Sequence, residues 1–206
     1  QDGVSVPVTD VITVNTPGTF ILENHASLVQ INDVTNVGSR TYKRNTTEMN
    51  NFDYTYWSSP VSGQTLYNLS PNTLSDKYHS FTDPNWKDEL GSNLMIAGKG
   101  YIIRTPKAGT WPNGEVVSFP YTQKVKFIGV PNNGDYTYIG ISNNKSYLLG
   151  NPYPSAIDAD AFLNENHLIL DGTIYFWTHN TGIAPSGAFY VYNDNDYASY
   201  NLTGGT

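Results

Sequence analysis

The chain has 206 residues, enough to bury a core as one large β-sandwich or as two small ones. Its 11 Lys and Arg against 18 Asp and Glu give a net charge of -7, and the cations do not cluster, which argues against nucleic-acid binding. It has no cysteine, which excludes disulfides and thiolate metal sites. No stretch approaches the roughly 18 apolar residues of a membrane span.

The composition predicts an all-β protein. Charged residues make up 14%, against about 25% in an average globular domain. The 16 Tyr favour strands, whereas the 18 Gly and 12 Pro favour turns and break helices. The mean hydropathy of -0.41 predicts a soluble protein. Such a low-charge, cysteine-free chain fits a bacterial extracellular protein, and its start at Gln1 indicates processing or a fragment.

The first fifty residues are predicted to form an N-terminal strand segment, 1–50. Short strands separated by turn residues are expected at 4–8, 11–14, 19–22 and 27–31. A further strand is expected over 40–44, and its cations predict an exposed or edge position.

A first β-unit is predicted over 51–123. Aromatic residues favour strands at 54–57 and 78–81, and the turn over 82–86 is expected to begin a short helix. The strand over 99–104 is expected to form a hairpin with 115–119 through the loop 110–114.

A second β-unit is predicted over 124–206, lacking its closing strand. Strands are expected at 125–130, 136–139, 146–149, 173–178 and 187–192. One short helix is expected through Phe162 and Leu163, with Ser155 or Asp158 as its N-cap.

A proline phrase occurs twice along the chain. Tyr56-Trp57-Ser58-Ser59-Pro60-Val61 is matched by Leu149-Gly150-Asn151-Pro152-Tyr153-Pro154, with Pro60 and Pro152 92 residues apart, and each copy is followed by an aromatic run. This spacing is the length of a small β-domain. We therefore predict two related, jelly-roll-like β-sandwich units in tandem after the N-terminal segment.

The second copy also carries a family resemblance. The run 149–158, with its Gly-Asn-Pro-Tyr-Pro-Ser-Ala-Ile-Asp block, resembles a module of large secreted or surface proteins of Bacteroidota (flavobacteria) exported by the type IX system, and 53–61, 172–177 and 197–201 fit the same pattern. The resemblance covers roughly residue 20 to the end. It implies an adhesin-like surface protein and supplies no catalytic residues. The chain departs from the pattern at its end, where the family continues into a Gly-rich closing strand and a sorting domain.

Few residues point to catalysis or metal binding. The four histidines are far apart and match no metal-ligand spacing: His25, His79, His167 and His179. Asp158 and Asp160 form the most tempting carboxylate pair, although Asp at a helix start commonly acts as a cap. Asp194 and Asp196 are weak Ca²⁺ ligand candidates, with a solvated turn as the more common role of such a run.

Two tryptophans are candidates for glycan stacking. Trp86 and Trp111 lie in turn-rich segments, where an exposed ring could stack on a sugar or could instead cap a small core. Trp57 and Trp177 lie in predicted strands and are expected in the core. The leading hypothesis is therefore a non-enzymatic structural or adhesive module that joins other surface proteins or copies of itself, by exchange of an N-terminal strand within 4–14. A carbohydrate-binding module is the alternative, and a hydrolase based on Asp158 and Asp160 is the third.

Overall fold

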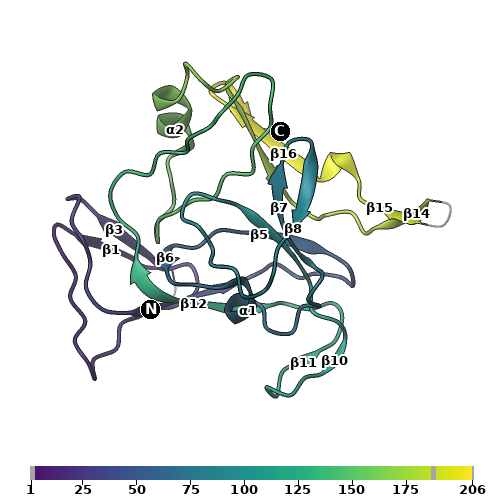
Figure 1. Ribbon diagram of the computed structural model, residues 1–206, viewed down its shortest axis with the longest axis horizontal. Helices are drawn as coiled ribbons and strands as arrows, with labels where there is room; N and C mark the ends of the chain where they lie inside the picture. The colour runs from purple at the N-terminus through teal and green to yellow at the C-terminus, as the bar shows by residue number, and fades with distance from the viewer. Residues whose placement is uncertain (1–2, 187–188, 206) are drawn as a thin grey trace.

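The computed structural model describes residues 3–186 and 189–205 (Figure 1). Strands dominate and form several separate sheets, so the predicted all-β, sandwich-type fold is confirmed. One four-stranded sheet has the order β2 (Ile21–Leu22), β4 (Arg40–Asn45), β12 (Lys124–Pro131) and β6 (Val61–Ser62). The other has the order β5 (Tyr54–Trp57), β9 (Tyr101–Arg104), β7 (Tyr78–Thr82) and β8 (Asn85–Asp88).

The main core lies between these two sheets. Tyr42 and Phe127 project from the first sheet, and Tyr101 and Ile103 from the second, and all four are buried. The ring of Trp57 meets that of Phe127 edge-on with centroids 5.9 Å apart, so the expectation that Trp57 packs against the core is confirmed. Each buried side chain of this kind contributes about 1.5–3 kcal/mol of transfer free energy.

The strand β4 is central, so the predicted edge position of 40–44 is wrong. β4 pairs with β2 on one side and with β12 on the other. Arg40 is 1% exposed, and its guanidinium donates to the carbonyls of Val37 and Gly38. Both bonds come from Nη1, whereas Nε and Nη2 of Arg40 are buried without a hydrogen-bond partner, so counting charges alone does not locate this strand.

A third sheet covers the outer face of the second. It has the order β13 (Thr173–Trp177), β16 (Tyr197–Asn201) and β17 (Gly204–Gly205) (Figure 1). The Trp177 ring stacks on that of Tyr56 with centroids 6.1 Å apart, and its Nε1 donates to the Tyr54 carbonyl at 3.0 Å. Trp177 thus packs between sheets rather than in the main core.

Three short strand pairs surround the sandwich. They are β1 (Ser5–Val8) with β3 (Ser27–Gln30), β10 (Gly109–Thr110) with β11 (Val116–Val117), and β14 (Ala184–Ser186) with β15 (Phe189–Val191). The predicted hairpin between 99–104 and 115–119 is wrong, because β11 pairs with β10 and β9 pairs inside the second sheet. The predicted strand over 187–192 includes 187–188, which lie outside the described residues.

The predicted helix is confirmed as α2 (Ala159–Glu165), with Asp158 as its N-cap. The sequence did not reveal α1 (Leu66–Leu69), a single turn capped by Thr65, or the 3-10 turn η1 (Asp194–Asp196). The expected helix after 82–86 is wrong, since this segment turns β7 into β8. The segments 136–139 and 146–149 also lack the predicted strands, and Leu149 makes only an isolated bridge to Lys99.

The two proline phrases lie side by side. The Ser58 hydroxyl donates to the Asn151 carbonyl at 2.7 Å. Asn132 is 7% exposed, and its Nδ2 donates to the carbonyls of Ser59 at 3.1 Å and Pro152 at 3.0 Å, one in each phrase. The end of β12 therefore clamps the two phrases together.

The first sheet draws strands from all three predicted segments. It joins β2 and β4 from 1–50, β6 from 51–123, and β12 from 124–206. The boundaries at 50 and 123 stay predictions. Within the described ranges, no helix has the length and apolar character needed to cross a membrane.

Candidate functional site

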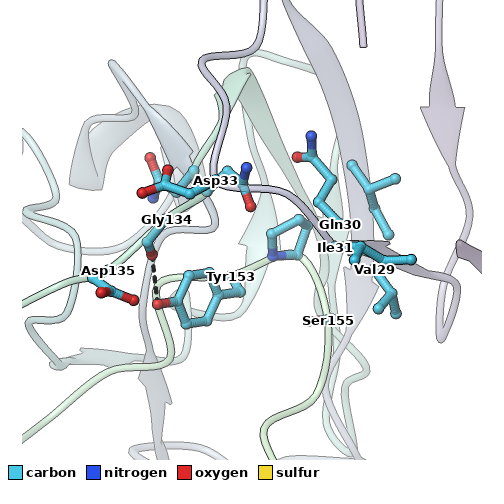
Figure 2. Close-up of a pocket in the computed structure, with 12 residues that line it drawn as sticks. Val29, Gln30, Ile31, Asp33, Gly134, Asp135, Tyr153 and Ser155 are labelled. Atoms are coloured by element: carbon cyan, nitrogen blue, oxygen red, sulfur yellow. Dashed lines mark hydrogen bonds between the residues drawn. The ribbon is translucent and has the colours of Figure 1, made fainter. Parts of the chain in front are cut away.

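A hollow of about 270 Å³ lies where β3, the loop after β12 and the second proline phrase meet (Figure 2). Its lining comes from residues far apart in the sequence: Leu28, Val29, Gln30, Ile31, Asp33, Asn132, Asn133, Gly134, Asp135, Tyr153, Pro154 and Ser155. The fold thus brings part of the doubled phrase against the N-terminal segment.

One wall of the hollow is a strand edge with an unused hydrogen-bond donor. The Ser27 N–H donates to the residue that precedes β1 at 2.9 Å, and the Ile31 N–H donates to β1 itself at 3.0 Å. The N–H groups of the alternate residues between them therefore point to the opposite edge of β3. On that second edge, the Leu28 N–H donates to the Pro154 carbonyl at 3.1 Å. The Gln30 N–H has no acceptor within residues 3–186 and 189–205.

The opposite wall is held by side-chain hydrogen bonds. Asn133 Nδ2 donates to the carbonyls of Asn32 at 2.8 Å and Val34 at 3.0 Å. The Tyr153 hydroxyl donates to the Gly134 carbonyl at 2.7 Å, as the dashed line in Figure 2 marks. These bonds fix the shape of the hollow without any ligand.

Two carboxylates give the hollow a negative charge. Asp33 and Asp135 both line it, and no cation is among its lining residues. Burial raises the pKa of Tyr153, and the nearby Asp135, Tyr136 and Asp33 raise it further. In Figure 2 the Tyr153 ring lies between these acidic loop residues and the strand residues Val29 and Ile31.

The backbone conformation at Gly134 favours glycine. Its φ of +80° lies in the left-handed region, which favours glycine. A Cβ at this position would also overlap the Asp33 carboxylate. The loop therefore holds the acidic group against the main chain at the rim.

Together these groups suit an extended, cationic ligand. The free strand edge can pair with a polypeptide backbone, and the carboxylates and the tyrosine ring can accept an ammonium or guanidinium group.

The two glycan candidates lie in different hairpins. Trp86 lies on the edge strand β8, is 46% exposed and meets the ring of Phe81 edge-on at 5.1 Å. Trp111 lies in the β10–β11 turn, where its Nε1 donates to the Lys107 carbonyl at 2.9 Å. Figure 1 shows these two hairpins at separate parts of the molecule.

The acidic pair in α2 has structural roles. Asp158 accepts the N–H of Ala161 at 2.9 Å, and Asp160 accepts the hydroxyl of Tyr200 at 2.7 Å. Both residues are exposed and line neither of the two hollows described for this structure. These contacts give both carboxylates a non-catalytic explanation.

The histidines are dispersed and contact different partners. His79 contacts Asp88 at 2.9 Å, His167 contacts the Asn164 carbonyl at 2.6 Å, and His179 contacts Thr47 at 2.9 Å. His25 has a positive φ of 63° in a turn. In the part of the chain that the structure describes, no three His, Asp or Glu side chains form a group that could hold a metal ion.

The two calcium candidates occupy different environments. Asp194 is exposed, whereas Asp196 is 1% exposed and accepts the Thr181 N–H at 2.9 Å. The second carboxylate oxygen of Asp196 has no hydrogen-bond partner. The pKa of the buried Asp53 is raised mainly by burial and, to a smaller extent, by the negative charge of Asp196. A broader hollow of about 750 Å³ lies nearby, lined by Thr47, Glu48, Asn50, Pro120, Trp177, Thr178, His179 and Asn180.

The sequence did not single out the residues of the 270 Å³ hollow as a site. Its one usable signal was the second proline phrase, which carries Tyr153 and Pro154 and is followed by Ser155. The free N–H of Gln30 and the charged pair depend on long-range packing and leave no local pattern.

A family model described as "Domain of unknown function (DUF8693)" matches residues 1–206. The chain therefore belongs to this family. No curated protein and no solved structure matches it.

Proposed function

We propose that this member of the DUF8693 family is a non-enzymatic structural or adhesive module of a bacterial cell-surface or secreted assembly. The observation that carries the proposal is the free edge of β3 inside a shaped hollow, because an open strand edge is a template for another chain. The low fraction of charged residues agrees with an extracellular location. The resemblance of 149–158 to secreted Bacteroidota modules agrees with it.

Self-association by strand exchange is part of this proposal. β1 pairs with β3 alone, over four residues, in a two-stranded parallel sheet. Such pairs are marginal in isolation, although Val6 and Val8 also pack against the core. The β1 strand of one copy can therefore replace the β1 strand of another copy in the pairing with β3, and this exchange can link subunits into a filament.

Light scattering over a range of concentrations tests the exchange. We expect the unaltered chain to form oligomers and Val6→Lys to lose them, because the lysine charge would lie where the exchanged β1 strand packs against the core. Val11→Lys is the matched control, since Val11 is 47% exposed and lies outside the β1 ladder. A chain that remains monomeric at millimolar concentration would refute self-association.

Carbohydrate binding is the second candidate function, and the exposure of Trp86 favours it. Its ring meets Tyr56 at 6.3 Å as well as Phe81 at 5.1 Å, so an exposed aromatic surface is available for stacking on a sugar. A glycan array should then show binding that Trp86→Ala abolishes and Trp111→Ala retains. Absence of binding to every polysaccharide would remove this candidate.

A further inference from the structure

We propose that the 270 Å³ hollow is a docking site for an extended segment of a different protein that carries a Lys or Arg side chain. This inference rests on the proposed function and deepens it, because it names the site and the chemistry of a partner. It concerns the edge of β3 that faces Pro154, whereas strand exchange concerns the edge that faces β1.

The main chain of β3 supplies the first requirement for docking. The Pro154 carbonyl already accepts the N–H of Leu28. An incoming strand would pair with the same edge of β3 by accepting the N–H of Gln30. The Gln30 side chain is itself fixed, since its Nε2 donates to Asn36 at 3.0 Å and its Oε1 accepts from Asn36 at 2.6 Å. The edge is thus preorganised and offers its N–H at little entropic cost.

Apolar side chains flank this edge. Val29 is 41% exposed and Ile31 is 68% exposed, and both line the hollow. Alternate side chains of a docked strand would cover them, which adds buried apolar area to the main-chain hydrogen bonds.

Charge selects the kind of segment. Asp33 and Asp135 have no ion-pair partner within the described ranges, and both raise the pKa of the Tyr153 phenol. A Lys ammonium or Arg guanidinium in the hollow would lie among two carboxylates and a tyrosine ring. An acidic segment would be repelled.

The same charge disfavours the N-terminal strand of a second copy. Residues 3–14 contain Asp10 and no Lys or Arg, so this segment would bring a carboxylate towards Asp33 and Asp135. The complementary partner is therefore a different chain with a basic, extended segment.

Three blocked seven-residue peptides of alternating threonine and valine would test the site by amide NMR titration. The first has a central lysine, the second a central glutamate, and the third the lysine with alternate amides methylated to block strand pairing. We expect the lysine peptide to shift the Gln30 amide resonance and to bind at least about tenfold more tightly than the other two.

Protein variants then assign the charge effect. Asp33→Asn with Asp135→Asn should weaken binding of the lysine peptide about threefold to thirtyfold, and the effect should shrink at high salt. Asp171→Asn with Asp194→Asn is the matched control, because it removes the same charge from exposed positions outside the hollow and should leave affinity unchanged.

Several results would overturn the inference. These are equal binding of the lysine and glutamate peptides, unchanged affinity in the Asp33/Asp135 double variant, or no shift at residues 28–33 with millimolar peptide. Binding of the chain's own 3–14 segment in preference to the lysine peptide would assign the hollow to self-association instead. Light scattering without peptide tests strand exchange separately, so failure of one proposal is distinguishable from failure of the other.

Discussion

Replacing Asn132 by alanine should destabilise the protein through the joint between the two proline phrases. The Asn132 side chain donates to the Ser59 and Pro152 carbonyls at 3.1 and 3.0 Å. Ser59 is fully buried, and Pro152 is also buried, so water cannot readily replace the lost donor. Two unsatisfied carbonyls at about 1–2 kcal/mol each predict a loss of about 2–4 kcal/mol in the free energy of unfolding.

Urea unfolding followed by tryptophan fluorescence measures this loss. Asn143→Ala is the matched control, because Asn143 is exposed in a turn and should change stability by less than about 0.5 kcal/mol. Asn132→Asp keeps the shape but replaces the amide donor by a carboxylate, so at neutral pH it should destabilise at least as much as Asn132→Ala. An Asn132→Ala variant within about 0.5 kcal/mol of the unaltered chain would refute the clamp.

Three further predictions concern stability. Gly134→Ala should cost about 1–3 kcal/mol in the free energy of unfolding, because its φ is +80° and a Cβ would overlap the Asp33 carboxylate; an unchanged urea midpoint would contradict this. Burial raises the pKa of Asp53, so the contribution of its protonated carboxyl group to the free energy of unfolding is fully present below about pH 4 and is lost as the pH rises through the folded-state pKa. Asp53→Asn should therefore flatten the dependence of Tm on pH between about pH 4 and 7. A dependence parallel to that of the unaltered chain would argue against this. Asp158→Ala should cost about 0.5–2 kcal/mol on thermal unfolding, and Asp158→Asn much less, because asparagine also caps a helix; equal losses in the two variants would contradict capping.

Local sequence patterns predicted several elements correctly. The run 54–57 alternates between two faces, and it forms β5 with Trp57 towards the main core and Tyr56 towards the third sheet. The polar residues ahead of an apolar turn predicted α2, and of the two cap candidates, Ser155 and Asp158, the structure has Asp158. These predictions succeed because side-chain alternation and capping depend on neighbours within a few residues.

Other predictions failed where distant contacts override local preference. Three cations in 40–44 predicted an edge strand or an exposed one, yet β4 pairs on both sides, and the buried Arg40 donates through Nη1 alone to local carbonyls. The aromatic segment 136–139 predicted a strand, but in the structure Tyr136 instead packs edge-on against Tyr153 at 5.7 Å. Strand partners and register are set by packing across the sandwich, which residue type alone does not specify.

The sequence by itself determined the all-β class, the absence of cysteine chemistry and the acidic charge, because composition and short periodicities carry this information. Only the tertiary structure decided that the two proline phrases touch, since they meet through the Ser58–Asn151 hydrogen bond and through Asn132 on a third segment. It also decided the candidate site. The free N–H of Gln30 and the two carboxylates of Asp33 and Asp135 line one hollow only because residues about a hundred positions apart fold against one another.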